Sequence, residues 1–332
     1  MRKRNTFLII WFLTTCLFIW FIFQGHHTFD APTTKYVIVA LFLCTMALLR
    51  WLPGPLNDLP SKARETRSGW LSLIVSVTIV IMFLARTLIG PPLLFAFPIL
   101  AVGILIYLRP KIGPQEVWYA TVLALMSGLT GLAAGWVPFQ PLVWAILQVC
   151  LVITGLIAGW SLLQHTGLWQ IGIGRSQFLD QGKKFALLSF GTGIAISIPW
   201  AIGIVLIGAS ASQQWVQRWW QPFIAINPGI SEEVWGRIFL IPLLFLILRT
   251  VIRAKRAYVL ALIIGSYWFA YLHTSGGLDG IVSTMMIGTL FVLPLTYICL
   301  HRDLETAIGF HFSVDFSKFV VALFLNTGLW LS

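Results

Sequence analysis

Continuous apolar runs of about 20 residues recur along this chain, and their length constrains the fold more than any other feature. Of the 332 residues, 58% are hydrophobic and only 10% are charged, whereas soluble domains carry about 25% charged residues. Because lipid cannot hydrogen-bond the backbone, only helices and closed barrels cross a bilayer. The runs are continuous rather than alternating, which indicates helices. The sequence therefore predicts an all-α, polytopic transmembrane helical bundle with about 11 spans.

Short segments rich in proline and glycine separate the predicted spans. The sequence Asn227-Pro228-Gly229 is one such break, and comparable turn sequences mark several others. The predicted spans are residues 7–24, 36–52, 69–89, 92–108, 118–136, 141–163, 185–208, 229–248, 257–273, 281–300 and 304–328.

The basic residues are distributed unevenly between the two sides of the predicted membrane. A net charge of +11 is also found in proteins that bind nucleic acid. With the N-terminus inside, however, only Lys35 and Arg218 lie outside, and Arg86, Arg237 and Lys318 lie within spans. The positive-inside rule then explains the charge as orientation, with a cytoplasmic N-terminus and no nucleic-acid partner. The inner segments hold the other basic residues: Arg2, Lys3, Arg4, Arg50, Lys62, Arg64, Arg67, Arg109, Lys111, Arg175, Lys183, Lys184, Arg249, Arg253, Lys255, Arg256 and Arg302.

Several common kinds of site are missing from the sequence. It contains no GxxxxGK[ST], GxGxxG or HExxH motif, which removes the simplest support for ATP-driven or zincin-type chemistry. The first predicted span is not followed by the small-residue pair that signal peptidase prefers, so a retained signal anchor is expected. The four cysteines are widely spaced within apolar spans and are expected to be buried, with neither a disulfide framework nor a zinc module.

Three charged residues lie in the eighth predicted span. Asn227 is expected to cap this helix, with Pro228 in its first turn. Glu232 and Glu233 would then lie near the helix N-terminus, where the dipole favours negative charge. Arg237 follows Glu233 by four residues, so these two are expected to form a structural ion pair. Glu232 is turned about 100 degrees away and is left free for chemistry.

Two later predicted spans each carry a histidine. The helix that ends at His273 runs antiparallel to the preceding one, so His273 is expected to meet Glu232. In the last span, His311 and Asp315 are four residues apart and share a helical face, with Lys318 close to it. Purely structural interpretations exist: His273 as a packed interfacial residue, and Asp315 as a buried carboxylate neutralised by Lys318.

In this order the motifs resemble those of the CAAX protease and bacteriocin-processing family, also called CPBP or Abi, which includes the type II CAAX prenyl endopeptidases. The family pattern is EExxxR, then FxxxH, then HxxxN or HxxxD. The resemblance covers roughly residues 185–328. This chain departs from it with Gly236 before the arginine and with an aspartate where prenyl endopeptidases usually have asparagine. The matching residues are Glu232, Glu233, Arg237, Phe269, His273, His311 and Asp315.

The resemblance implies intramembrane proteolysis, with hydrolysis of a peptide bond in a membrane-associated or prenylated protein or peptide. Glu232 would be the general base, and His273 would help it to orient or deprotonate the water. Glu233 and Arg237 would secure the geometry. His311 with Asp315 would stabilise the oxyanion. This requires a hydrogen-bond donor, which the histidine can provide and an ionised aspartate cannot.

Asp315 is then expected to orient His311, although a protonated Asp315 or one held by Lys318 is an alternative. No cofactor or metal is expected, because the resembled prenyl endopeptidases are regarded as glutamate-dependent. Zinc is the alternative, since it accepts nitrogen and oxygen ligands in tetrahedral geometry. Its ligands would be Glu232, His273, His311 and Asp315.

Two other classes of function stay open. The same ionisable residues could line a proton or solute path in a transporter, or the chain could be a catalytically idle regulatory scaffold. The expected organisation is an N-terminal extension of about six spans over residues 1–184 and a peptidase core over residues 185–332. A multi-pass protein of a prokaryotic plasma membrane is expected, with membrane lipid and a peptide or lipid-modified protein as its partners.

The predicted depths of the two histidines differ. At 1.5 Å per residue, His273 lies about 27 Å from Lys255, whereas His311 lies about 14 Å from Arg302. The motifs are therefore expected to converge only if the last span begins in a depressed or re-entrant turn, or if a deep cavity links the two levels. The charge rule opens such a cavity outward, while the resembled prenyl processing occurs on the cytosolic side.

Overall fold

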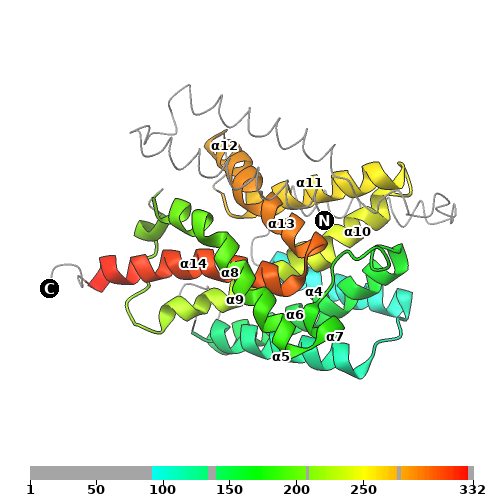
Figure 1. Ribbon diagram of the computed structural model, residues 1–332, viewed down its shortest axis with the longest axis horizontal. Coiled ribbons are helices and arrows are strands. Elements are labelled where there is room, and N and C mark those ends of the chain that lie inside the picture. Colours follow the sequence, from blue (N-terminus) through cyan, green and yellow to red (C-terminus); the bar gives the residue numbers. More distant parts are fainter. Residues whose placement is uncertain (1–91, 134–139, 207–208, 275–277, 328–332) are drawn as a thin grey trace.

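The structure is a computed structural model that describes residues 92–133, 140–206, 209–274 and 278–327, and every regular element in these ranges is helical (Figure 1). The first three predicted spans lie outside the described residues. The helices are α4 (Pro92–Leu108), α5 (Pro114–Gly131), α6 (Pro141–Thr166), α7 (Gln177–Gln181), α8 (Lys183–Leu206), α9 (Ile226–Glu233), α10 (Leu240–Leu248), α11 (Ala254–Leu272), α12 (Leu278–Ile287), α13 (Leu293–His301) and α14 (Leu304–Thr327). Short 3-10 segments lie at η2 (Ala209–Ser212) and η3 (Gln221–Ala225), and π-helical turns at η4 (Val234–Phe239) and η5 (Gly288–Val292).

Each predicted span within the described residues corresponds to a helix or to a run of consecutive helical segments. Four helices there are long and apolar enough to cross a membrane: Pro141–Thr166, Lys183–Leu206, Ser283–His301 and Leu304–Thr327. The chain is thus an integral membrane protein whose described part is all-helical, and the count of about 11 spans stays a prediction.

Helix α5 begins earlier than predicted, at Pro114 instead of residue 118. Proline suits the first turn of a helix because the amide hydrogen that it lacks would have no partner there.

Two predicted spans are not continuous α-helices. The eighth is divided into α9, η4 and α10, and the tenth into α12, η5 and α13. In a π-helical turn the backbone widens by one residue, and such turns are frequent at functional sites. The turn η4 carries Arg237 and directly follows the two glutamates.

Helices α8 and α14 share the largest helix–helix contact in the described part of the chain, and Figure 1 shows α8 passing beside α14. Two glycines make the close approach possible. A Cβ atom on Gly193 would lie 2.1 Å from the carbonyl oxygen of Thr306, and one on Gly309 would lie 2.1 Å from that of Phe190. Small residues at such crossings are typical of helix packing in membranes.

The N-terminal end of α14 lies inside the molecule. Asp303 is 2% exposed and Glu305 is 4% exposed, whereas a span that starts at the membrane surface exposes its first turn. The Glu305 carboxylate accepts hydrogen bonds from the Tyr119 hydroxyl at 2.8 Å and the Ser176 hydroxyl at 2.5 Å. It also accepts from the backbone amides of the two residues after Ser176, each at 3.0 Å. The start of the last span is thus buried within the protein, and its depth in the membrane stays a prediction.

The helices before residue 185 pack into the same core as those after it. One cluster of buried apolar residues contains Tyr119 of α5 and Leu156 of α6 together with Ile238 of η4 and Phe310 of α14. The predicted boundary at residue 184 therefore divides a continuous hydrophobic core, and its functional meaning stays a prediction. Cys299 is buried as expected, whereas Cys150 is exposed on the surface of α6, and both thiols are free.

Candidate active site

Glu232 and Glu233 are the last two residues of α9, immediately before the π-helical turn. The prediction that Asn227 caps this helix is wrong, because η3 runs directly into α9 and its helical backbone already includes residue 225. The Asn227 amide instead donates to the carbonyl and hydroxyl oxygens of Ser127 on α5, at 2.8 and 3.0 Å. This polar contact fixes the start of α9 against α5.

Glu233 and Arg237 form the predicted ion pair, with 2.9 Å between the Arg237 Nη1 and Glu233 Oε1 atoms. Both side chains are completely buried. The Arg237 guanidinium also donates to the Glu232 carbonyl oxygen at 3.1 Å and lies 4.0 Å from the centroid of the Phe269 ring. Through these contacts, Arg237 ties the π-helical turn to the end of α9 and to Phe269 on α11.

His273 immediately follows α11 and faces Glu232. Its Nδ1 lies 2.9 Å from the carbonyl oxygen of Phe269, and since a carbonyl only accepts, Nδ1 carries the proton. Its Nε2 lies 3.5 Å from Glu232 Oε2. Phe269 therefore holds Arg237 with its ring and orients His273 with its backbone.

His311 reaches the same oxygen of Glu232 from α14. Its Nδ1 lies 2.7 Å from Glu233 Oε1, and its Nε2 lies 3.6 Å from Glu232 Oε2. The ring is thus oriented through Nδ1 by Glu233, and not by Asp315 as the sequence led us to expect. A carboxylate behind an imidazole fixes the tautomer and leaves Nε2 toward the site.

Asp315 faces the same His311 nitrogen as Glu232. Its Oδ2 is 3.6 Å from His311 Nε2, and its Oδ1 is 2.7 Å from the Lys318 ammonium. The predicted contact between Asp315 and Lys318 is therefore present. Two carboxylates, Glu232 and Asp315, flank one imidazole nitrogen, and this arrangement stabilises positive charge on the ring.

Exposure decreases across the site in one direction. The His273 side chain is 42% exposed and that of Glu232 is 22% exposed, whereas that of His311 is only 4% exposed. The His273 side of the cluster is therefore the more accessible one. Glu232 lies between an accessible imidazole and a buried one.

Residues 214–317 match the family described as type II CAAX prenyl endopeptidase Rce1-like, and this range contains all three motifs. Over these residues, the chain is similar to the Rce1-like family. The match is narrower than the resemblance to residues 185–328 noted from the sequence. Searches of curated proteins and of solved structures found no match.

Two residues of the Rce1-like region have contacts that sequence reasoning missed. The Phe269 ring covers Arg237, although the motif suggested no role for it. A Cβ on Gly236 would lie 3.0 Å from the Phe269 ring, so the glycine that departs from the family pattern leaves space for this aromatic side chain. In the sequence, the only indication of a role for Phe269 was its position four residues before His273.

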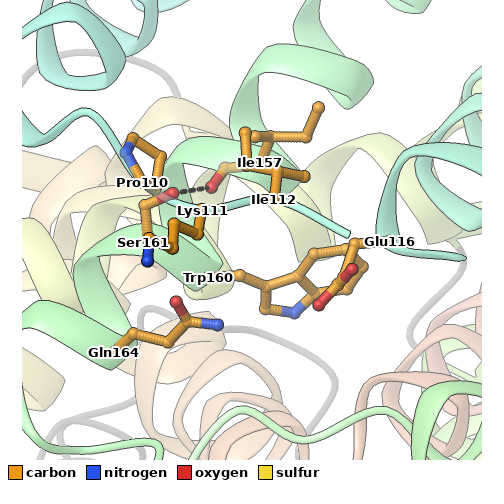
Figure 2. Close-up of a pocket in the computed structure, with 8 residues that line it drawn as sticks. All are labelled: Pro110, Lys111, Ile112, Glu116, Ile157, Trp160, Ser161 and Gln164. Atoms are coloured by element: carbon orange, nitrogen blue, oxygen red, sulfur yellow. Dashed lines mark hydrogen bonds between the residues drawn. The ribbon is translucent and has the colours of Figure 1, made fainter. Parts of the chain in front are cut away.

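Among the described residues, no group of three or more His, Cys, Asp or Glu side chains is arranged to hold a metal ion. A small pocket lies between α6 and the connection from α4 to α5, where the Ser161 hydroxyl bonds to the Ile157 carbonyl (Figure 2). None of its lining residues belongs to the three motifs: Pro110, Lys111, Ile112, Glu116, Ile157, Trp160, Ser161 and Gln164.

Proposed function

We propose that this protein is an intramembrane endopeptidase that cleaves a membrane-associated or lipid-modified protein or peptide with water activated by Glu232 and His273. The observation that carries the proposal is the meeting of Glu232 Oε2 with the Nε2 atoms of two histidines, at 3.5 and 3.6 Å. The family match supports a CAAX-type peptidase. A prenylated peptide is the first substrate to test.

Glu232 is the proposed general base. Its carboxylate is partly exposed, it accepts no hydrogen bond from Arg237, and its Oε2 faces His273 Nε2. A single water can contact both atoms, donating one proton toward the carboxylate and presenting a lone pair to a scissile carbonyl. General bases placed in this way contribute about 10²- to 10⁴-fold to the rate.

His311 is the proposed donor to the oxyanion. Its Nδ1 proton is held by Glu233, so only Nε2 is available to the reacting atoms. A protonated Nε2 donates to the developing negative charge, and the carboxylates that contact the ring favour that protonated form. In this proposal, Asp315 stabilises the charge on His311 Nε2 and does not itself contact the oxyanion.

The decisive experiment compares purified wild type with Glu232→Gln on prenylated and unmodified peptides, with and without a chelator, and measures bound metal. We expect wild type to cleave and Glu232→Gln to lose about 10²- to 10⁴-fold in kcat. The amide keeps the shape of the side chain but cannot accept the proton. Glu116→Gln, which changes a partly exposed glutamate of α5, is the matched control.

Equal cleavage by wild type and Glu232→Gln would exclude Glu232 as the base. Loss of cleavage on chelation, restored by zinc, would replace the metal-free mechanism. A protein that cleaves no peptide but passes solute across liposomes, with flux abolished in Glu232→Gln, would be a transporter.

A further inference from the structure

Fixed positive charges are scarce around this site. In the described part of the chain, the carboxylates of Glu232, Glu233 and Asp315 all lie within 3.6 Å of the His311 ring nitrogens. Two lysine or arginine side chains contact these carboxylates. Arg237 binds Glu233 at 2.9 Å, and Lys318 binds Asp315 at 2.7 Å. Each cation therefore serves a different carboxylate.

Lys318 holds only one oxygen of Asp315. The contact is between Nζ and Oδ1, across one turn of α14, and the two side chains are only 19% and 15% exposed. The ammonium also lies 4.8 Å from the centroid of the neighbouring Phe319 ring. A charge pair that is partly buried and spans one helical turn is screened less by solvent than an exposed pair.

This contact determines where the second oxygen of Asp315 lies. With Oδ1 bound to Lys318, Oδ2 faces His311 Nε2 at 3.6 Å, too far for a hydrogen bond. Without the ammonium, the carboxylate would be free to rotate and to bind Nε2 directly. That nitrogen would then be occupied by Asp315 and would no longer be available to the reacting atoms.

We infer that Lys318 is a positioning residue of the peptidase site, which keeps Asp315 turned away from His311 Nε2 and so leaves this nitrogen available to the reacting atoms. The inference rests on the proposed function and deepens it. It assigns a role to a residue outside the EExxxR, FxxxH and HxxxD motifs. It also explains why an aspartate at position 315 is accompanied by a lysine one turn later.

The test is a double-mutant cycle measured as kcat and KM on the same cleaved peptide. Lys318→Met should lower kcat about tenfold with KM changed less than about twofold, because transition-state contacts are lost while substrate binding is kept. Lys318→Arg should retain most of the activity. In an Asp315→Asn background, adding Lys318→Met should change kcat by less than about twofold, because the neutral amide leaves no charge to hold. Lys255→Met, which removes an exposed lysine at the start of α11, is the control.

A merely structural role predicts a different pattern. Lys318→Met would then lower kcat and thermal stability by the same amount whether position 315 is Asp or Asn. That result, or a kcat of Lys318→Met equal to that of wild type, would overturn the inference.

A second measurement separates this inference from the proposed function. Spectra of protein labelled with ¹⁵N-histidine contain signals from six histidines, and loss of one signal pair in His311→Gln assigns that ring. Lys318→Met should shift the His311 Nε2 signal, and the shift should be absent in the Asp315→Asn background. If wild type cleaves no peptide and this shift is present, the proposed function fails while the positioning contact stands. An unchanged Nε2 signal overturns the inference, whatever the cleavage assay gives.

Discussion

Glu233 connects the structural and the chemical parts of the motif cluster. One oxygen of this fully buried carboxylate meets both the Arg237 guanidinium and the His311 ring. A buried carboxylate requires compensation of this kind, since an isolated charge inside a protein or a membrane is costly. Glu232, one residue earlier, has no such cation and is partly exposed. Adjacent glutamates therefore have separate tasks, because only one of them faces Arg237.

The first prediction at the residue scale concerns this buried pair. Glu233→Gln keeps the side-chain shape but leaves Arg237 buried without its counter-charge, which should cost about 3–5 kcal/mol of unfolding free energy. Glu232→Gln is the matched control and should cost much less. Unfolding in detergent, followed by tryptophan fluorescence, compares the two. Similar losses for both variants would contradict the division of tasks between the glutamates.

The sequence predicted which residues meet, but not how each is held. The spacing of Glu233 and Arg237 indicated their ion pair, and the antiparallel order of the spans indicated the contact between Glu232 and His273; both contacts are observed. The orientation of His311 was assigned to Asp315, because four residues on one helix are visible in a sequence. A contact from Glu233, 78 positions away, depends on the tertiary packing.

The secondary-structure elements were likewise predicted only in part from the sequence. Apolar length predicted the helices, because the requirement to satisfy the backbone in lipid leaves few alternatives. The π-helical turns at residues 234–239 and 288–292 and the buried start of α14 were not predicted. These features depend on what packs against each helix, so local periodicity carries no signal for them.

The second prediction concerns the crossing of α8 and α14, which carries His311. Gly193→Ala would place a methyl group against the backbone of α14 and should destabilise the protein by about 1–3 kcal/mol. Gly191 lies two residues earlier on the same helix, and a Cβ there meets nothing within 4 Å. Gly191→Ala should be neutral or stabilising by about 0.5–1 kcal/mol, because alanine favours a helix. Equal effects of the two substitutions on the detergent unfolding midpoint would contradict this crossing.

On the scale of the whole molecule, Glu305 links the helices before residue 185 to the proposed peptidase core. Its carboxylate lies at the start of α14 and binds Tyr119 of α5 and three groups at or just before the start of α7. His311 follows six residues later on the same helix. The helix that carries this histidine is therefore held at its start by contacts with a part of the chain that the sequence assigned to a separate extension.

The last prediction tests this link. In Glu305→Gln, the amide group cannot accept all the hydrogen bonds that the carboxylate receives, which should cost about 3 kcal/mol or more of unfolding free energy. Since α14 would lose its fixed start, kcat should fall more than KM rises, although Glu305 contacts none of the proposed catalytic groups. Glu116→Gln on α5 is the control for removing a carboxylate. A loss of stability without any change in kcat would show that α14 holds His311 in place without this contact, and the helices before residue 185 would then not be required to position the site.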